Sequence, residues 1–288
     1  MKLLLRNNNF SRTNNPFFVH FTILLSFIIL QGCTSDIDTK KSLQTVSDNS
    51  YVFSEEVSLI RSQIVESSVL NKLIRDQEVP FNNMLLNSPL NSKHYINSLE
   101  MATNIGVYIA DLNYLFAYEQ DQARITYLDA IFYLAEKLDV ENAFDHRKFD
   151  VLLSDGLLSH NEKIDFLEIL VKEAEEKINS DARAQIVALI LSGSYIEGIF
   201  INFNLANSAW PNEIIGSELL NHLESYDRIK KILEHFKDYQ PCSDRLADLE
   251  KLDPMVKMIL KGDILEIKDN LEEINDAVGA LRMSLIKV

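Results

Sequence analysis

The chain has 288 residues, enough for a domain with a sizeable core, and 47% of them are apolar. Its 43 acidic residues outnumber its 28 basic residues, which gives a formal net charge of −15 at pH 7. A surface of this charge is repelled by nucleic-acid phosphates and by anionic lipid headgroups, so we expect no nucleic-acid partner and no electrostatic attachment to membranes.

The first apolar segment, residues 17–30, follows a short polar stretch that carries Lys2, Arg6 and Arg12 and no acidic residue. A helix that crosses about 30 Å of hydrocarbon needs roughly 20 apolar residues, so this run is too short for an ordinary membrane span. A basic stretch followed by an apolar run of this length is typical of a secretory signal peptide. An uncleaved anchor and a chance apolar run are the alternatives.

The end of this segment, residues 30–33, reads Leu-Gln-Gly-Cys and resembles the lipobox of bacterial lipoproteins. In a lipobox an aliphatic residue at −3 and a small residue at −1 precede the lipidated Cys. The resemblance implies acylation of Cys33 and removal of residues 1–32 as a signal peptide. Removal takes away three positive charges and leaves the mature chain at −18. Several acyl chains on one Cys hold a protein stably on a membrane.

Residues 33–52 are polar and rich in Ser, Thr and Asp, and they predict a flexible tether ahead of a domain at 53–288. Within the tether, Ser-Asp-Ile-Asp at 35–38 is similar to the acidic tags of surface lipoproteins in some Gram-negative bacteria. Thr34 stands at the +2 position, where Asp marks inner-membrane retention in other bacteria. These resemblances imply an outer-membrane lipoprotein that faces the periplasm or the cell surface.

From residue 54 onward apolar residues recur with a helical period, and alternating strand patterns are nearly absent. Ser159 and Glu162 predict a capping box at the start of one helix, and Ser180 predicts the N-cap of the next. Pro211 and Pro254 are expected in the first turns of two further helices. The fold class is therefore all-α, a bundle of roughly eight to ten helices. The helices expected from the pattern cover about residues 54–79, 92–120, 122–138, 159–178, 180–207 and 263–286.

Two stretches, residues 105–117 and 186–206, are apolar nearly all round, which predicts two central helices. They also resemble each other at an offset of 87 residues, which pairs Gly106 with Gly193 and Tyr108 with Tyr195. The pattern predicts a duplicated unit of three or four helices, although a few matches also arise by chance in helical sequence. The repeat halves would cover about residues 53–158 and 159–288. Gly within both helices indicates close helix packing or room for a ligand.

The central helices carry two acidic residues, Asp111 and Glu197, in stretches suited to burial. Asp111 follows Tyr108 by three positions and shares its helix face, whereas Glu197 lies two positions after Tyr195. A buried carboxylate is costly unless it is paired or hydrogen-bonded. One interpretation places these four residues in an inter-helical cleft, and the other has the carboxylates bonded to Tyr hydroxyls or helix ends, or facing a solvent groove.

Signals for metals, cofactors and catalysis are weak. Glu218 and His222 lie at i and i+4 but lack a third ligand, and no phosphate-binding Gly loop or nucleophile motif occurs. The stretch GVYIAD at 106–111 is similar to the G-x-H-x-x-E signature of imelysin-like envelope proteins, with Tyr108 replacing its His and Asp111 its Glu, so the metal role does not carry over. If Cys33 is lipidated, Cys242 is alone, and we expect a small semi-buried residue at a helix start. We predict no metal, cofactor or catalytic residue.

The stretches NIGVYIADLNYLFAYEQ and ALILSGSYIEGIF resemble those of uncharacterised all-helical envelope lipoproteins of Gram-negative bacteria. This resemblance implies a fold and a cellular location but no activity. We therefore expect a lipid-anchored, non-enzymatic binding module, held on the membrane by acyl chains on Cys33, whose partner is an envelope protein or a small ligand. The alternative is an enzyme with an unrecognised site near Asp111 and Glu197.

Overall fold

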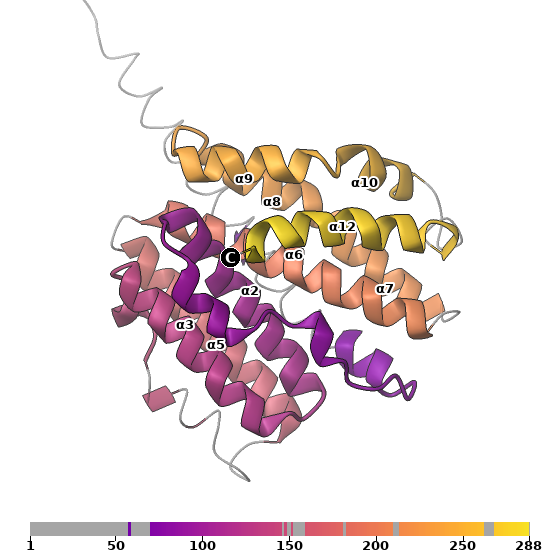
Figure 1. Cartoon of the computed structure of the whole chain (residues 1–288), viewed down its shortest axis with the longest axis horizontal. Helices are drawn as coiled ribbons and strands as arrows, with labels where there is room; N and C mark the ends of the chain where they lie inside the picture. The colour runs from indigo at the N-terminus through magenta and orange to yellow at the C-terminus, as the bar shows by residue number, and fades with distance from the viewer. Residues whose placement is uncertain are drawn as a thin grey trace, which may run out of the picture. The chain divides into compact units, whose positions relative to one another are not determined.

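A computed structural model of the chain describes residues 57–58, 70–145, 147–148, 151, 159–180, 183–209, 213–261 and 268–287 (Figure 1). These residues all belong to one compact unit, Thr45–Val288. Over the described residues the fold is all-helical with no β-strand, which confirms the predicted all-α bundle. The predicted signal peptide and most of the predicted tether precede this unit, and both lie outside the described residues.

The described part of the bundle consists of α-helices joined by short connections, with three 3-10 turns. The α-helices are α2 (Ser98–Ala117), α3 (Asp121–Lys137), α5 (His160–Ser180), α6 (Ala184–Ala209), α7 (Glu213–Glu224), α8 (Tyr226–His235), α9 (Gln240–Glu250), α10 (Asp253–Ile259) and α12 (Leu271–Ile286). The 3-10 turns are η1 (Asn83–Leu85), η2 (Pro89–His94) and η3 (Glu141–Ala143).

Helices α2 and α6 form the centre of the bundle, as predicted. Every residue from 102 to 117 in α2 and from 186 to 199 in α6 is buried. Helix α3 packs on α2, helices α7, α8, α9 and α12 pack on α6, and α5 contacts both central helices. The two helices that are apolar all round are thus the two that other helices surround.

Glycine allows α2 and α6 to touch through their backbones. A Cβ atom on Gly106 would lie 1.9 Å from the carbonyl oxygen of Ile190, and one on Gly193 would lie 2.0 Å from that of Thr103. Real Cβ atoms do not approach so closely, so only Gly fits either position. The sequence left two reasons for these glycines, close helix packing and room for a ligand. The structure shows close helix packing at both positions.

The two glycine contacts are equivalent under the 87-residue offset. Gly106 and Gly193 are related by that offset, and so are their contact partners, Ile190 and Thr103. A duplicated unit whose copies pack about a two-fold axis predicts this exchange. The repeat and its boundaries stay a prediction, with which this exchange of contacts is consistent.

Helix α2 begins later than expected, at Ser98 and not at residue 92. Asn97 is its N-cap: the Asn97 side chain accepts from the Glu100 N–H at 2.9 Å, and the Glu100 carboxylate accepts from the Asn97 N–H at 3.4 Å. This capping box fixes the helix start. The preceding residues 89–94 form the 3-10 turn η2, which begins at Pro89.

Two further helix boundaries differ from the prediction. Ser180 does not cap the following helix, because it belongs to the last turn of α5, and α6 begins at Ala184. The last helix ends at Ile286 as expected but begins at Leu271, because Asn270 has a non-helical backbone conformation that interrupts the helix. The expected start near 263 lies outside the described residues, as does Pro211.

The first expected helix, 54–79, lies mostly outside the described residues and ends at residue 75, and α2 ends at Ala117 and not near 120. Three further predictions are confirmed. Helix α3 covers residues 121–137, within one residue of the expectation. The capping box ahead of α5 is present, with the Ser159 N–H donating to the Glu162 carboxylate at 2.7 Å and the Glu162 N–H donating to the Ser159 hydroxyl at 3.4 Å. Pro254 lies in the first turn of α10.

Cys242 lies in the first turn of α9, where it is fully buried rather than semi-buried. Its thiol is 3.6 Å from the carbonyl oxygen of Gln185. Burial raises the pKa of Cys242 to about 12, so the thiol stays protonated at neutral pH. Because the thiolate is the reactive form, this Cys serves packing rather than chemistry.

The glycine contact between α2 and α6 is testable by adding one methyl group. Gly106→Ala would force the backbones of α2 and α6 apart, and we expect it to lower the free energy of unfolding by about 3 kcal/mol or more. The measurement is urea unfolding followed by circular dichroism.

Gly279→Ala is the matched control, because a Cβ there would meet only the Phe200 ring, at 3.7 Å. We expect this variant to gain about 0.5 to 1 kcal/mol from the higher helix propensity of Ala. Equal effects at Gly106 and Gly279 would contradict a backbone contact at the crossing.

Candidate functional site

Two of the predicted site residues, Tyr108 and Asp111, contact a segment without α-helix, residues 79–96, which we call the strap. The strap includes the 3-10 turns η1 and η2 and precedes α2 in the chain. In Figure 1 it crosses the near side of the bundle and approaches the C-terminal end of α12. A non-helical segment against the core needs partners for its backbone polar groups, because it makes few hydrogen bonds of its own.

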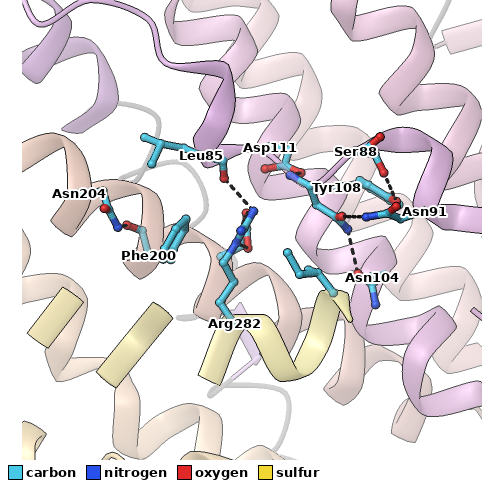
Figure 2. A network of polar contacts seen from close by, with 12 residues as sticks. Leu85, Ser88, Asn91, Asn104, Tyr108, Asp111, Phe200, Asn204 and Arg282 are labelled. Carbon is cyan, nitrogen blue, oxygen red and sulfur yellow. Dashed lines mark hydrogen bonds and ion pairs between the residues drawn. The ribbon is translucent and has the colours of Figure 1, made fainter. Parts of the chain in front are cut away.

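The strongest contact to the strap comes from Arg282 in α12. Its Nε and Nη2 atoms donate to the two oxygens of Glu197 at 2.8 and 2.7 Å, and Nη2 also donates to the Leu85 carbonyl at 2.7 Å. The guanidinium carbon lies 4.3 Å from the centre of the Phe200 ring. Figure 2 shows Arg282 reaching from α12 between Phe200 and the strap. The ion pair is bidentate, which is the strongest geometry for these two groups.

Asp111 lies beside this ion pair, also fully buried. One carboxyl oxygen accepts from the Asn87 N–H of the strap at 3.2 Å, the other has no donor among the described residues, and the group lies next to Glu197. Burial, followed by the charge of Glu197, raises the pKa of Asp111 well above its usual range. A raised pKa favours the neutral form, in which Asp111 would have a proton to donate to Glu197.

Glu197 keeps its charge because of Arg282. Burial raises the pKa of Glu197, while the hydrogen bonds from Arg282 and Asp111 act in the opposite direction. With Asp111 neutral, the charges of Glu197 and Arg282 cancel. A buried group of three ionisable residues with no net charge avoids most of the cost of burying an isolated ion.

Tyr108 and a set of amide side chains hold the rest of the strap. The Tyr108 hydroxyl donates to the Ser88 carbonyl at 2.9 Å (Figure 2). The Asn87 side-chain amide donates to the Tyr95 hydroxyl at 3.0 Å and to the side-chain oxygen of Asn104 at 3.1 Å. The Asn104 amide in turn donates to the backbone of α12, at the Leu285 carbonyl, at 2.9 Å. These bonds connect the strap to both α2 and α12.

The structure therefore brings together three of the four predicted cleft residues: Tyr108, Asp111 and Glu197. Asp111 and Glu197 are 0% exposed, so they lie in the packed interior and not on an open surface. The second interpretation of the sequence, that these carboxylates have structural partners, describes their contacts better. The partners are a backbone N–H and an Arg, not the Tyr hydroxyls or helix ends that were expected.

Tyr195 lies apart from the other three, in a second buried polar cluster. Its ring meets the His222 ring edge-on at a centroid distance of 5.6 Å, and its hydroxyl has no hydrogen-bond partner within the described parts of the chain. The two-residue spacing of Tyr195 and Glu197 explains the separation, because i and i+2 residues face different sides of a helix.

His222 is buried in this second cluster and is not part of a solvated pair with Glu218. Its Nδ1 atom lies 3.0 Å from the Asn202 amide nitrogen, which donates to it. Burial lowers the pKa of His222 to about 4, so the ring is neutral at physiological pH. Among the described residues no group of three or more His, Cys, Asp or Glu side chains could hold a metal ion.

Hollows in the described part of the bundle lie away from the acidic pair. A cavity of about 20 Å³, the size of one water molecule, lies between α2, α5 and α6 and is lined almost wholly by apolar side chains. A surface hollow of about 340 Å³ lies between η2 and α3, where Leu90, Lys93, Asp129 and Tyr133 contribute to its wall. Asp111 and Glu197 line neither.

Sequence reasoning missed Arg282 and the strap. Arg282 continues the buried stripe of α12 at the spacing Ile274, Val278 and Arg282, so a charged residue on an apolar stripe was the available signal. The signal for the strap was its composition, because Pro80 and Pro89 bracket a run rich in Asn. The expected helix start at residue 92 placed the end of the strap in the second helix, and Arg282 was not singled out.

Helix α6 also meets the length and hydropathy criteria of a membrane span over Ala184–Ser208. In the bundle, 94% of its most apolar 18-residue window is buried, as in the core helix of a globular domain. Comparison with protein-family models, curated proteins and solved structures finds no match to this chain.

The assignment of the proton to Asp111 predicts unequal effects of removing the two carboxylates. Asp111→Asn keeps a donor toward Glu197 and an acceptor for the Asn87 N–H, so we expect a loss of about 1 kcal/mol or less. Glu197→Gln leaves the buried Arg282 without its counter-charge, so we expect a loss of about 3 to 5 kcal/mol. Urea unfolding at pH 7 measures both. Equal losses would mean that Asp111 is charged.

Burial of neutral His222 predicts a pH dependence of stability. The folded pKa of about 4 lies below the usual 6.5, so between these values the unfolded chain binds the extra proton and stability falls as the pH falls. We expect the difference in unfolding free energy between the wild type and His222→Gln to shrink by about 3 kcal/mol from pH 7 to pH 4. A difference that stays constant over this range would contradict a buried neutral ring.

Proposed function

We propose that this chain is a lipid-anchored protein of the bacterial cell envelope whose helical domain is a non-enzymatic interaction module. The Leu-Gln-Gly-Cys sequence at 30–33 supports the anchor, together with the basic and apolar segments before it. Acyl chains on Cys33 would supply the membrane attachment that the acidic surface does not.

The proposed interaction role rests on what the buried polar network binds. Arg282 donates to Glu197 and to the Leu85 carbonyl of the strap, and Asp111 accepts from the Asn87 N–H of the strap. Both carboxylates are 0% exposed, so the network is better placed to hold a surface segment than to contact a substrate. Rigidly held loops on a helical scaffold are where binding surfaces commonly lie.

A small ligand would fit best in the hollow of about 340 Å³ between η2 and α3. This volume is at the lower end of the range found for ligand pockets, and its wall combines apolar and charged side chains. The hollow is next to the strap, so a fixed strap would also fix this wall.

We further propose that the protein lies on the outer membrane and faces the periplasm or the cell surface. Support comes from Thr34 after the lipidated position and from the acidic residues at 36 and 38. The alternative function, an enzyme with Asp111 and Glu197 as its site, would need an opening of the bundle that gives a substrate access to these buried groups.

Lipidation predicts a defined mass for the mature protein. The wild type should lack residues 1–32, carry acyl chains on Cys33 and partition into detergent, and Cys33→Ser should stay unprocessed. Intact-mass spectrometry of the two proteins side by side is the measurement. Cys242→Ser is the matched control, because it changes the other Cys and should be processed like the wild type. Identical full-length masses for the wild type and Cys33→Ser would exclude the anchor.

A further inference from the structure

The strap differs in charge from the rest of the chain. No Asp or Glu occurs between Glu78 and Glu100, although the chain has 43 acidic residues in 288. Within this interval Lys93 and His94 are both exposed. The C-terminal half of α12, residues 277–287, is also free of acidic residues and ends at the exposed Lys287.

These two acid-free segments contact each other. The Tyr95 hydroxyl lies 3.4 Å from the Ile286 carbonyl, and Arg282 donates to the Leu85 carbonyl at 2.7 Å. Together they form one region, which we call the neutral surface: residues 79–96 and 277–287. The region carries no carboxylate of its own, and the carboxylates at its edge are Glu100, which accepts from the Ile96 N–H at 2.9 Å, and Asp129, which lines the hollow beside Leu90 and Lys93.

The neutral surface also exposes large apolar side chains. Met84 and Ile96 are each 81% exposed, Leu90 is 69% exposed and Met283 is 55% exposed. Isolated apolar residues on a surface are ordinary, but four on two contacting segments that lack acidic residues call for a partner.

We infer that the neutral surface contacts the lipid bilayer to which the protein is anchored, with Met84, Leu90, Ile96 and Met283 entering the interfacial layer. This inference rests on the proposed lipid anchor at Cys33, which would keep the domain close to a bilayer. Apolar side chains flanked by Lys are the pattern of interfacial membrane contact. Lys93, His94 and Lys287 would face the headgroups.

The shape of the surface favours lipid over a protein partner. These apolar side chains are between 55% and 81% exposed, and polar residues such as Asn91 lie between those of the strap, whereas protein interfaces bury aromatic or Arg anchors in complementary pockets. A fluid bilayer accepts protruding side chains without a matching pocket. The hydrogen bonds that fix the strap keep these side chains in place before contact, which lowers the entropy lost on insertion.

The test places a fluorescent label on the surface of the full, lipidated protein. In Ile96→Cys the new thiol is the one that reacts, because Cys33 carries lipid and Cys242 is buried. The protein is bound to vesicles of phosphatidylethanolamine and phosphatidylglycerol that contain a nitroxide-labelled lipid as quencher. Ile214→Cys is the matched control, at 62% exposure on α7 and next to Glu213.

We expect about threefold stronger quenching at position 96 than at position 214, and a loss of this difference when Leu90→Asp is added. Equal, weak quenching at both positions on protein that floats with the vesicles would overturn the inference and leave the anchor intact. A label at 96 that is water-exposed in vesicles but shielded in native envelope fragments would assign the surface to a protein partner and would also overturn it. Protein that fails to float with vesicles would instead contradict the anchor, and with it the inference.

Discussion

The backbone contact between α2 and α6 at Gly106 and Gly193 determines how the rest of the bundle is arranged. No other residue type fits either position, because a Cβ would lie within about 2 Å of a carbonyl oxygen of the facing helix. At this separation side chains a few residues further along the two helices meet directly. Asp111 on α2 and Glu197 on α6 therefore lie next to each other in the core, and α12 completes the group with Arg282.

The buried charges are explained by the backbone that they bind. The strap has no α-helix, so several of its peptide groups lack the partners that an α-helix provides. Leu85, Asn87 and Ser88 obtain them from Arg282, Asp111 and Tyr108. Removing any of these side chains leaves a buried peptide group or a buried charge unpaired.

The sequence predicts the helical class, the two central helices and the two anomalous carboxylates, because these depend on local periodicity and on polar residues within apolar runs. It does not predict the pairing of Asp111 with Arg282 and Glu197, because residues 171 positions apart on different helices leave no local pattern. Tyr195 was grouped with Glu197 by sequence proximity, yet a two-residue spacing turns them to different faces. The start of α2 was misplaced because the capping box of Asn97 and Glu100 is stronger than the helical period before it.

The pairing of the buried charges also bears on where function lies. Groups that act on a substrate need free hydrogen-bonding capacity and access, and the pairing of Asp111, Glu197 and Arg282 leaves little of either. The network fixes the position of the strap at the surface. The strap has no acidic residue and exposes apolar side chains. Under the proposed lipid anchor, the domain would stay close to the bilayer at high effective concentration, and even a weak contact at this surface would orient it. Orientation, which a flexible tether alone cannot give, would then be the property that the buried charges supply.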